Sequence, residues 1–477
     1  MRKSEDDQEG YALAEKAVAL CSGRGVIYAN ATYRRSSELG MFFKNGSLSV
    51  ISPDSDAGIS VRVVTDRGVG FASTNHLGAG GVRTAVSHAL SMARAGSGNS
   101  ADFAAGKAEV AEWTSPQKIK FGDVDTEEKV RRISELDSAM SDASRLKSFR
   151  QVGYGETVEH KFYADTDGAR ITALDPKVEI SYFIMLQKGG DYEQAHRQLG
   201  YSGGFEAIDE LKAESRAVEE VMAVETMLEK GRRFVPGTYD LVCGNEVTGI
   251  ACHESCGHPM EADRIMGREA AQAGKSFVEL DSGGMRIGSE LVTIVDDPTI
   301  ERSFGFYLYD DEGVKARRRT LYRRGVVDEF LQNRESGSKS GSISNGAGRA
   351  ASYDSEPLVR MANTYLLPGG HSDQELVEGV KRGVLLKSFN EWNIDDRRFN
   401  QKYVGREAYL IENGEITVPV RSPVLEITTP GFWSAVDAVA KRIEYSGGTC
   451  GKGDPMQGME VDMGGPMIRL RGIRMKG

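Results

Sequence analysis

Tight-turn dipeptides between alternating apolar runs recur along the chain, and they constrain its fold more than any other feature. Asn-Gly between two β-rich runs is a strong short-range signal for an antiparallel hairpin. Comparable turn signals occur at several places in the 477 residues, and the C-terminal part is especially rich in short strands. The turn positions are Asn45-Gly46, Asp167-Gly168, Asn413-Gly414 and Gly464-Gly465. We therefore predict an α+β chain in which antiparallel hairpins form both the first and the last sheet.

Apolar residues repeat at helical spacing in three other segments, which predicts helices among the strands. One stripe covers residues 82–93. A second, over 130–143, follows Asp125 and Glu128, which form a capping-box-like pair. A third and longer helix is predicted over 208–228, with Val218 and Met222 placed on its buried side.

Two breaks in these patterns suggest domain boundaries. The Ala/Gly/Ser-rich stretch 95–106 is typical of a linker. Gly231 and Pro236 are stop signals for the long helix. The predicted divisions are an N-terminal antiparallel sheet with helices at 1–105, a central α/β region at 106–231, and a β-rich, barrel- or sandwich-like C-terminal domain at 232–477.

Charge and composition exclude several classes of partner. The 60 Lys and Arg residues against 70 Asp and Glu give a formal charge of −10, whereas a nucleic acid requires a basic face. No apolar segment follows Arg2 and Lys3, and no run of about 18 apolar residues occurs, so neither a signal peptide nor a membrane helix is expected. The five cysteines are sparse and odd in number. They fit a cytoplasmic protein better than a disulfide framework.

Two polar segments each have two interpretations. Residues 336–349 carry few apolar anchors, so they form either a mobile surface loop or a lid that orders over substrate. The basic stretch 315–324 could suggest nucleic acid, but acidic residues flank it on both sides. We favour a solvated hairpin that turns at Gly325.

The most informative segment contains two of the chain's seven histidines, His253 and His258, with Glu254 directly after the first. Zinc-protease helices space their histidines i, i+4, which brings both rings to one face. A spacing of i, i+5 separates them by about 140° on an ideal helix. Gly257 favours a helix end, and Pro259 biases the residue before it away from helix. We predict that the helix stops near Gly257 and that His258 returns toward a metal from an extended backbone.

A catalytic zinc site usually has three protein ligands and one open position, so a third ligand is needed. Cys252 and Cys256 share one helical face and could serve, but such cysteines more often pack as small buried hydrophobes. Cys450 lies in a glycine-rich loop, 447–453, which would allow close backbone approach and an accessible thiol. That loop could equally be an ordinary turn. Spacing alone leaves the third ligand open.

A longer pattern extends beyond the histidines: His253-Glu254-x-x-x-His258-x-x-Glu261-x-Asp263, followed near the C-terminus by Cys450-Gly451-Lys452. Together they resemble the TldD/PmbA family, of the TldD type, once labelled modulators of DNA gyrase and now regarded as metallopeptidases. Residues 360–364 and 409–415 also resemble that family's C-terminal region.

The resemblance implies that His253, His258 and Cys450 bind Zn²⁺ and that Glu254 is the catalytic carboxylate. It also implies unfolded or short peptides as substrates. A dimer is expected, either a homodimer or a heterodimer with an inactive paralogue that lacks these groups.

Chemical roles follow from this ligand set. Glu254 would act as general base and acid, passing a proton from water to the leaving amine. Glu261 and Asp263 either orient an imidazole through its second nitrogen or form a solvated acidic pair.

We therefore predict a cytoplasmic zinc-dependent peptidase, with no membrane or nucleic-acid partner. One alternative is a non-catalytic peptide-binding or regulatory subunit, in which Cys252 or Cys256 closes a four-ligand structural zinc site. Another is an amide or ester hydrolase that acts on small molecules.

Overall fold

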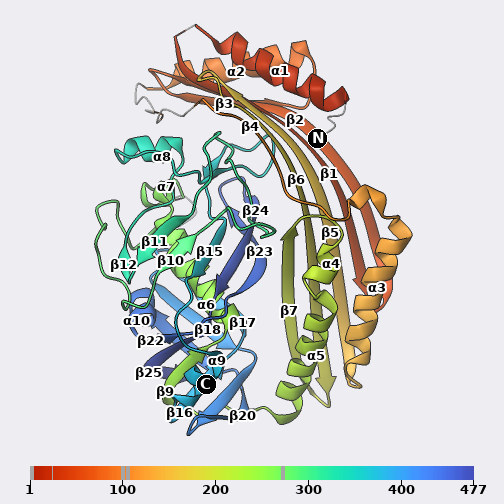
Figure 1. The fold of residues 1–477 in the computed structure, drawn as a ribbon, viewed down its shortest axis with the longest axis vertical. Helices are drawn as coiled ribbons and strands as arrows, with labels where there is room; N and C mark the ends of the chain where they lie inside the picture. The colour runs from red at the N-terminus through yellow and green to blue at the C-terminus, as the bar shows by residue number, and fades with distance from the viewer. Residues whose placement is uncertain (1–4, 24, 98–102, 104–107, 270–273) are drawn as a thin grey trace.

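A single curved sheet of seven strands is built from the first 202 residues of the computed structural model (Figure 1). Its order is β3-β2-β1-β5-β6-β4, with β7 also on β6, and only β4 runs parallel to its neighbour. The turns at Asn45-Gly46 and Asp167-Gly168 join β1 to β2 and β5 to β6, which confirms both predicted hairpins. The strands are β1 Val26–Lys44, β2 Ser47–Thr65, β3 Val69–Thr74, β4 Val110–Thr114, β5 Lys147–Asp165, β6 Arg170–Lys188 and β7 Asp191–Ser202.

The structure describes residues 5–23, 25–97, 103, 108–269 and 274–477. Most of the predicted linker at 95–106 lies outside these ranges. The seven-stranded sheet continues across the predicted boundary at 105/106, since β4 and β5 both lie in it. The three domain divisions remain predictions.

Helices pack on one face of this sheet because apolar side chains alternate along its strands. On β1, Tyr33, Met41 and Phe43 are buried among apolar side chains on the helix-covered face. Arg34 points to the opposite face, where it pairs with Asp311 of the C-terminal part. The helices are α1 Glu5–Cys21, α2 Ala79–Ala95, α3 Thr126–Asp142, α4 Ala207–Glu210 and α5 Ala213–Lys230, with a 3₁₀ turn, η1, at Phe121–Asp123.

The helices differ from the sequence predictions in three respects. Helix α1 was not predicted, because its buried face consists largely of small residues such as Ala14 and Ala17. The predicted helix over 208–228 is two helices, broken at Lys212, which takes a left-handed conformation with φ 52°. Met222 is 57% exposed and not on the buried side. Helix α3 forms as predicted, but the side chain of its N-cap residue, Asp125, accepts no capping hydrogen bond.

Two mixed sheets form most of the C-terminal part as sandwich-like layers, beside a separate antiparallel pair of β13 and β14, which confirms the predicted α+β class. One has the order β12-β11-β10-β15-β24-β23, and the other β17-β18-β21-β25-β9-β16-β19-β20-β8, with β22 on β25. The predicted turn Asn413-Gly414 joins β19 to β20. The strands are β8 Arg232–Arg233, β9 Gly237–Cys243, β10 Ile294–Asp296, β11 Arg319–Arg323, β12 Val326–Val327, β13 Gly348–Arg349, β14 Leu358–Val359, β15 Asn363–Leu366, β16 Arg382–Leu386, β17 Phe389–Ile394, β18 Asn400–Gly405, β19 Ala408–Glu412, β20 Glu415–Arg421, β21 Val424–Thr428, β22 Val436–Val439, β23 Glu444–Lys452, β24 Gln457–Gly465 and β25 Ile468–Lys476.

Short helices connect these strands, and one of them, α6, is central. From Val247 to Cys252 it is buried on every side, in a core shared with both sheets. Because Gly249 has no side chain, α6 can lie against the backbone of β24, where an added Cβ would be 3.0 Å from the Met463 carbonyl carbon. The helices are α6 Asn245–Cys252, α7 Ala262–Ile265, α8 Arg334–Lys339, α9 Asp373–Glu378 and α10 Thr429–Ser434.

The predicted final hairpin at Gly464-Gly465 is wrong. Strands β24 and β25 belong to different sheets, and β24 pairs instead with β23. The glycine-rich stretch 447–453 is therefore largely strand β23 rather than a loop, with Cys450 opposite Met459. Its glycines do serve the close approach that the sequence suggested, because an added Cβ at Gly447 would lie 2.5 Å from the Gly200 nitrogen of β7.

Gly447→Ala is expected to destabilise the contact between β23 and β7, since neither backbone can yield without moving a strand. A forced core insertion costs about 1–3 kcal/mol. The midpoint of thermal unfolding should therefore fall. Gly155→Ala is the matched control, because its Cβ would meet no atom within 4 Å. Equal melting of the two variants would show that the strands are not tightly docked.

The two polar segments have distinct outcomes. The basic stretch ends in the predicted hairpin, with Arg324 and Gly325 at φ 49° and 75° between β11 and β12. Arg319 is not solvated as expected, because it is fully buried and paired with Asp296. Residues 336–349 are not a bare surface loop: α8 has a capping box at Asn333, and much of 344–349 is buried.

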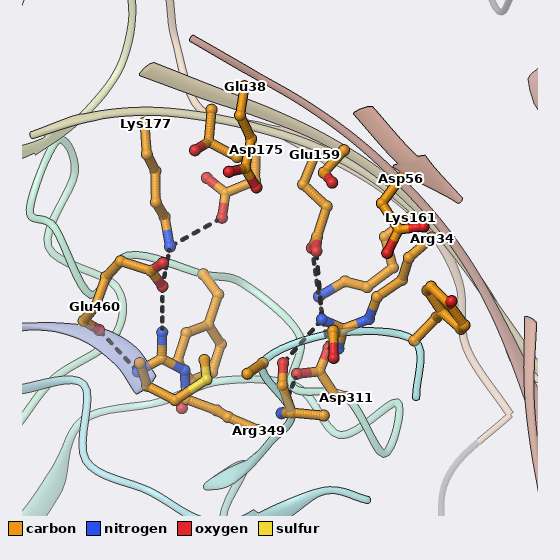
Figure 2. Close-up of a pocket in the computed structure, with 18 of the residues that line it drawn as sticks. Arg34, Glu38, Asp56, Glu159, Lys161, Asp175, Lys177, Asp311, Arg349 and Glu460 are labelled. Atoms are coloured by element: carbon orange, nitrogen blue, oxygen red, sulfur yellow. Dashed lines mark hydrogen bonds and ion pairs between the residues drawn. The ribbon is translucent and has the colours of Figure 1, made fainter. Parts of the chain in front are cut away.

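Ion pairs join the concave face of the first sheet to the C-terminal part, around a cavity of about 270 Å³ (Figure 2). Figure 2 shows Lys177 between Asp175 and Glu460, at 3.2 and 3.4 Å. On the other side of the cavity Arg34 pairs with Asp311 at 2.8 Å. The cations labelled in Figure 2 are all paired with carboxylates, so we interpret this cavity as part of the interface between the first sheet and the C-terminal part.

In the part of the chain that the structure describes, no helix combines the length and the apolar character needed to cross a membrane.

Candidate metal centre

A π-helical turn, not a helix end, brings the two histidines together. After α6, residues His253–Gly257 form a single π turn, in which the His258 N–H donates to the His253 carbonyl. Five residues span this wider turn, so the imidazoles lie on the same side, with ring centroids 4.9 Å apart. The predicted extended backbone is wrong: Gly257 and His258 are both right-handed, at φ −64° and −57°.

Close packing surrounds the π turn. Gly257 is required, because an added Cβ would lie 1.9 Å from the Met361 sulfur. Pro259 has no N–H to donate to the preceding turn, which ends the regular ladder. Ser255 is fixed from outside by the Trp433 indole, whose Nε1 donates to Ser255 Oγ at 2.9 Å.

His253, His258 and Cys450 form one buried cluster, with one potential ligand atom from each within 4.8 Å of the others. Cys450 Sγ is 3.5 Å from His258 Nε2. Zinc bonds of about 2.0–2.3 Å place tetrahedral ligand atoms about 3.5 Å apart, so this spacing suits a shared ion. His253 Nδ1 is buried without a hydrogen-bond partner, which also fits a metal-binding group.

The cluster's environment favours the protonation states that metal ligands need. Burial lowers the pKa of His253 and of His258, so both imidazoles stay neutral. Burial alone would raise the pKa of the Cys450 thiol, but the positive charge that His258 carries when protonated outweighs burial, and the pKa of the thiol is lowered. The thiol is only 7% exposed, so the accessible thiol expected from the sequence is wrong.

Glu261 and Asp263 are buried, which excludes a solvated acidic pair. Glu261 Oε2 accepts from His258 Nδ1 at 3.0 Å, an arrangement that orients the ring. Asp263 contacts Lys452 instead, with its Oδ1 2.7 Å from Nζ. Burial opposes ionisation of Glu261, but Lys452, His258 and Arg264 hold the pKa of its carboxyl well below the usual range.

Glu254 lies beside the cluster and lines a cavity of about 520 Å³ that also contacts His253, His258 and Cys450. Burial raises the pKa of the Glu254 carboxyl, against the lowering effect of His253 and Arg398. The Arg398 guanidinium donates to Glu254 Oε2.

Residues of both the first sheet and the C-terminal part line this cavity. The first sheet contributes Phe183 of β6 and the segment 194–198 of β7, and the C-terminal part contributes β17 and β23. His196 of β7 also lines this cavity. Residues 336–349 are not among the described residues that line it, and their role as a lid stays a prediction.

The alternative ligands Cys252 and Cys256 lie in the apolar core and fall outside the metal-ligand cluster found among the described residues. Burial raises the pKa of both thiols, which disfavours the thiolate that a metal needs. The geometry therefore favours three protein ligands rather than four.

Sequence reasoning missed Arg398 as a site residue. It follows Asp395-Asp396-Arg397 in a polar turn between two strands, a pattern that is typical of solvated loops. The sequence offered no signal that this turn lies opposite the π turn.

A buried His/His/Cys cluster, with a carboxylate beside it and a cavity in front, is the arrangement of a metal-dependent hydrolase. Three family models match the chain: PmbA/TldA metallopeptidase domain 1 at 31–93, its central domain at 119–225 and its C-terminal domain at 236–477. The chain belongs to the PmbA/TldA metallopeptidase family, as the resemblance predicted.

Similar sequences agree with this assignment, and solved structures share the fold. A metalloprotease of Methanocaldococcus jannaschii is 31% identical, over 89% of this chain and 92% of that protein. A zinc metalloprotease TldD homolog of Saccharolobus solfataricus is 27% identical, over 90% and 91%. A putative modulator of DNA gyrase from Thermotoga maritima has the same fold, with a TM-score of 0.80 at 16% identity, covering 98% of this chain and 99% of its own. TldE from Thermococcus kodakarensis aligns with a TM-score of 0.76 at 16% identity, over 98% and 100%.

Proposed function

We propose that this metallopeptidase is a zinc peptidase in which His253, His258 and Cys450 hold the ion and Glu254 transfers protons. The observation that carries the proposal is the cluster of two imidazoles and one thiol at the wall of a cavity, next to a carboxylate. When bound there, zinc would polarise the scissile carbonyl and lower the pKa of water to about 7.

The chain's own groups supply the remaining steps. The new C–O bond forms as Glu254 takes a proton from the attacking water at its carboxylate, and the peptide C–N bond then breaks as Glu254 gives that proton to the leaving amine nitrogen. Glu261 fixes the tautomer of His258 by accepting from Nδ1, which leaves Nε2 for the ion. Lys452 keeps Glu261 ionised within the buried site.

The substrate we propose is an unfolded or short peptide in an extended conformation. Strand β17 is an edge strand, paired only with β18 in the described sheet, and its residues 390–393 are exposed. Asn390 and Trp392 of this strand line the site cavity. A peptide that adds to this edge would bind through main-chain hydrogen bonds, with little dependence on its sequence.

We also propose that the protein acts in the cytoplasm as a dimer. The partner is either a second copy or an inactive paralogue, and the shared fold with the protein named TldE supports such a pairing. Light scattering of the chain purified alone would separate the two, because a homodimer forms without a second gene product.

Chelation is expected to abolish cleavage of an unstructured protein, and added Zn²⁺ to restore it. The measurement combines metal content with peptide products by mass spectrometry, before and after dialysis against a chelator. Cleavage that persists without metal would contradict the proposal. Bound zinc without cleavage would favour the regulatory subunit, and turnover of small esters alone would favour the small-molecule hydrolase.

A further inference from the structure

Arg398 is the cation in direct contact with the carboxylate proposed as general base. Its Nη1 donates to Glu254 Oε2, and its side chain is 19% exposed at the cavity wall. Its Nε is buried without a hydrogen-bond partner. Arg197, another cation of this cavity, is engaged elsewhere, with Nη2 2.8 and 2.7 Å from Glu220 and Glu246.

The backbone holds Arg398 in a conformation that few residues adopt. Its φ is 63°, in the left-handed region, which costs energy for a residue with a side chain. Its N–H donates to the Asp395 carbonyl at 2.8 Å, and its carbonyl accepts from Thr429 Oγ1 at 2.8 Å. The Asp395 carboxylate accepts from the N–H groups of Phe399 and Asn400 at 2.8 and 3.1 Å. These hydrogen bonds hold the backbone of Arg398 in the conformation from which its side chain reaches Glu254.

We propose that Arg398 is a positioning residue that holds the Glu254 carboxylate in the orientation needed for proton transfer. This inference rests on the proposed peptidase function. The guanidinium engages Oε2 and leaves Oε1 to take the proton from water. A carboxylate held in advance loses no time or free energy in reorientation, and a displacement of about 1 Å can cost about 100-fold in rate.

Loss of this contact should lower kcat with little change in KM. Arg398→Gln is expected to reduce kcat by about 100-fold while zinc content stays at the wild-type level. Arg398→Lys, which keeps the charge, should recover part of that loss. Arg397→Gln is the matched control, because Arg397 is an exposed neighbour in the same turn that does not line the site cavity, and it should retain wild-type kcat.

A second measurement does not depend on activity. Arg398→Gln leaves Glu254 buried without its cation, so its thermal midpoint should fall, and adding Glu254→Gln should recover much of that fall. Additive effects of the two substitutions on melting would overturn the pairing. Wild-type kcat in Arg398→Gln would overturn the positioning role, whereas an inactive wild-type protein would overturn the peptidase proposal itself.

Discussion

Glu254→Gln is expected to keep the fold and the zinc ion but lose peptide hydrolysis. The amide has nearly the same shape, and Glu254 lies outside the three-residue ligand cluster. Glutamine can still accept the hydrogen bond from Arg398, so the local packing should persist. It cannot take a proton from water or return one to the leaving amine. General acid–base catalysis typically contributes about 10²–10⁴-fold, and kcat/KM should fall by at least this range.

The test needs three readouts on one preparation: zinc content, the thermal midpoint, and kcat/KM with an unstructured protein. Glu246→Gln is a suitable control, because this carboxylate lines the same cavity but is held by Arg197. It should retain most activity. If Glu254→Gln were fully active, the assignment of the base would be wrong. If the Glu254→Gln variant lost zinc, Glu254 would be a metal ligand rather than the group that transfers the proton.

The sequence predicts the fold correctly where local turn chemistry decides it. It does not predict which strands become neighbours in a sheet. Asn-Gly turns fix their own two strands, so the hairpins at Asn45 and Asn413 form as expected. Gly464-Gly465 also separates two alternating strands, but alternation says only which side chains share a face. It does not say which strand lies alongside, and β24 and β25 join different sheets. The break at Lys212 could not be predicted, because this left-handed residue is not a glycine and the sequence shows no turn signal there.

The candidate metal site could likewise be predicted only in part. The rule that i, i+5 residues diverge holds for an α-helix, and the two expected helix breakers, Gly257 and Pro259, do not interrupt the turn, since Gly257 and His258 both stay right-handed. They act differently from the prediction: close packing on Gly257 and the missing N–H of Pro259 accompany a π turn, which brings the rings together without ending the helix. Cys450 lies 192 residues beyond His258. No periodicity reaches that far, so only the family resemblance could select it over Cys252.

Cys450→Ala is expected to remove most bound zinc, because it deletes the one thiol of the cluster and leaves two neutral imidazoles. Removal even of a group that only supports a metal ligand costs about 10–100-fold in metal affinity, so loss of a ligand should exceed 100-fold. Competition with a zinc-binding dye would measure this shift directly. Activity should be lost in parallel, while the thermal midpoint of the metal-free protein should change little.

Cys252→Ala discriminates the competing ligand sets. Cys252 is fully buried in the apolar core, so its truncation should leave zinc affinity unchanged and cost only some stability. Two affinity measurements then decide the nature of the site. Loss in Cys450→Ala alone means three protein ligands and a position open to water, as hydrolysis requires. Loss in both variants means a closed four-ligand site with no position for water, and the regulatory subunit would then replace the enzyme.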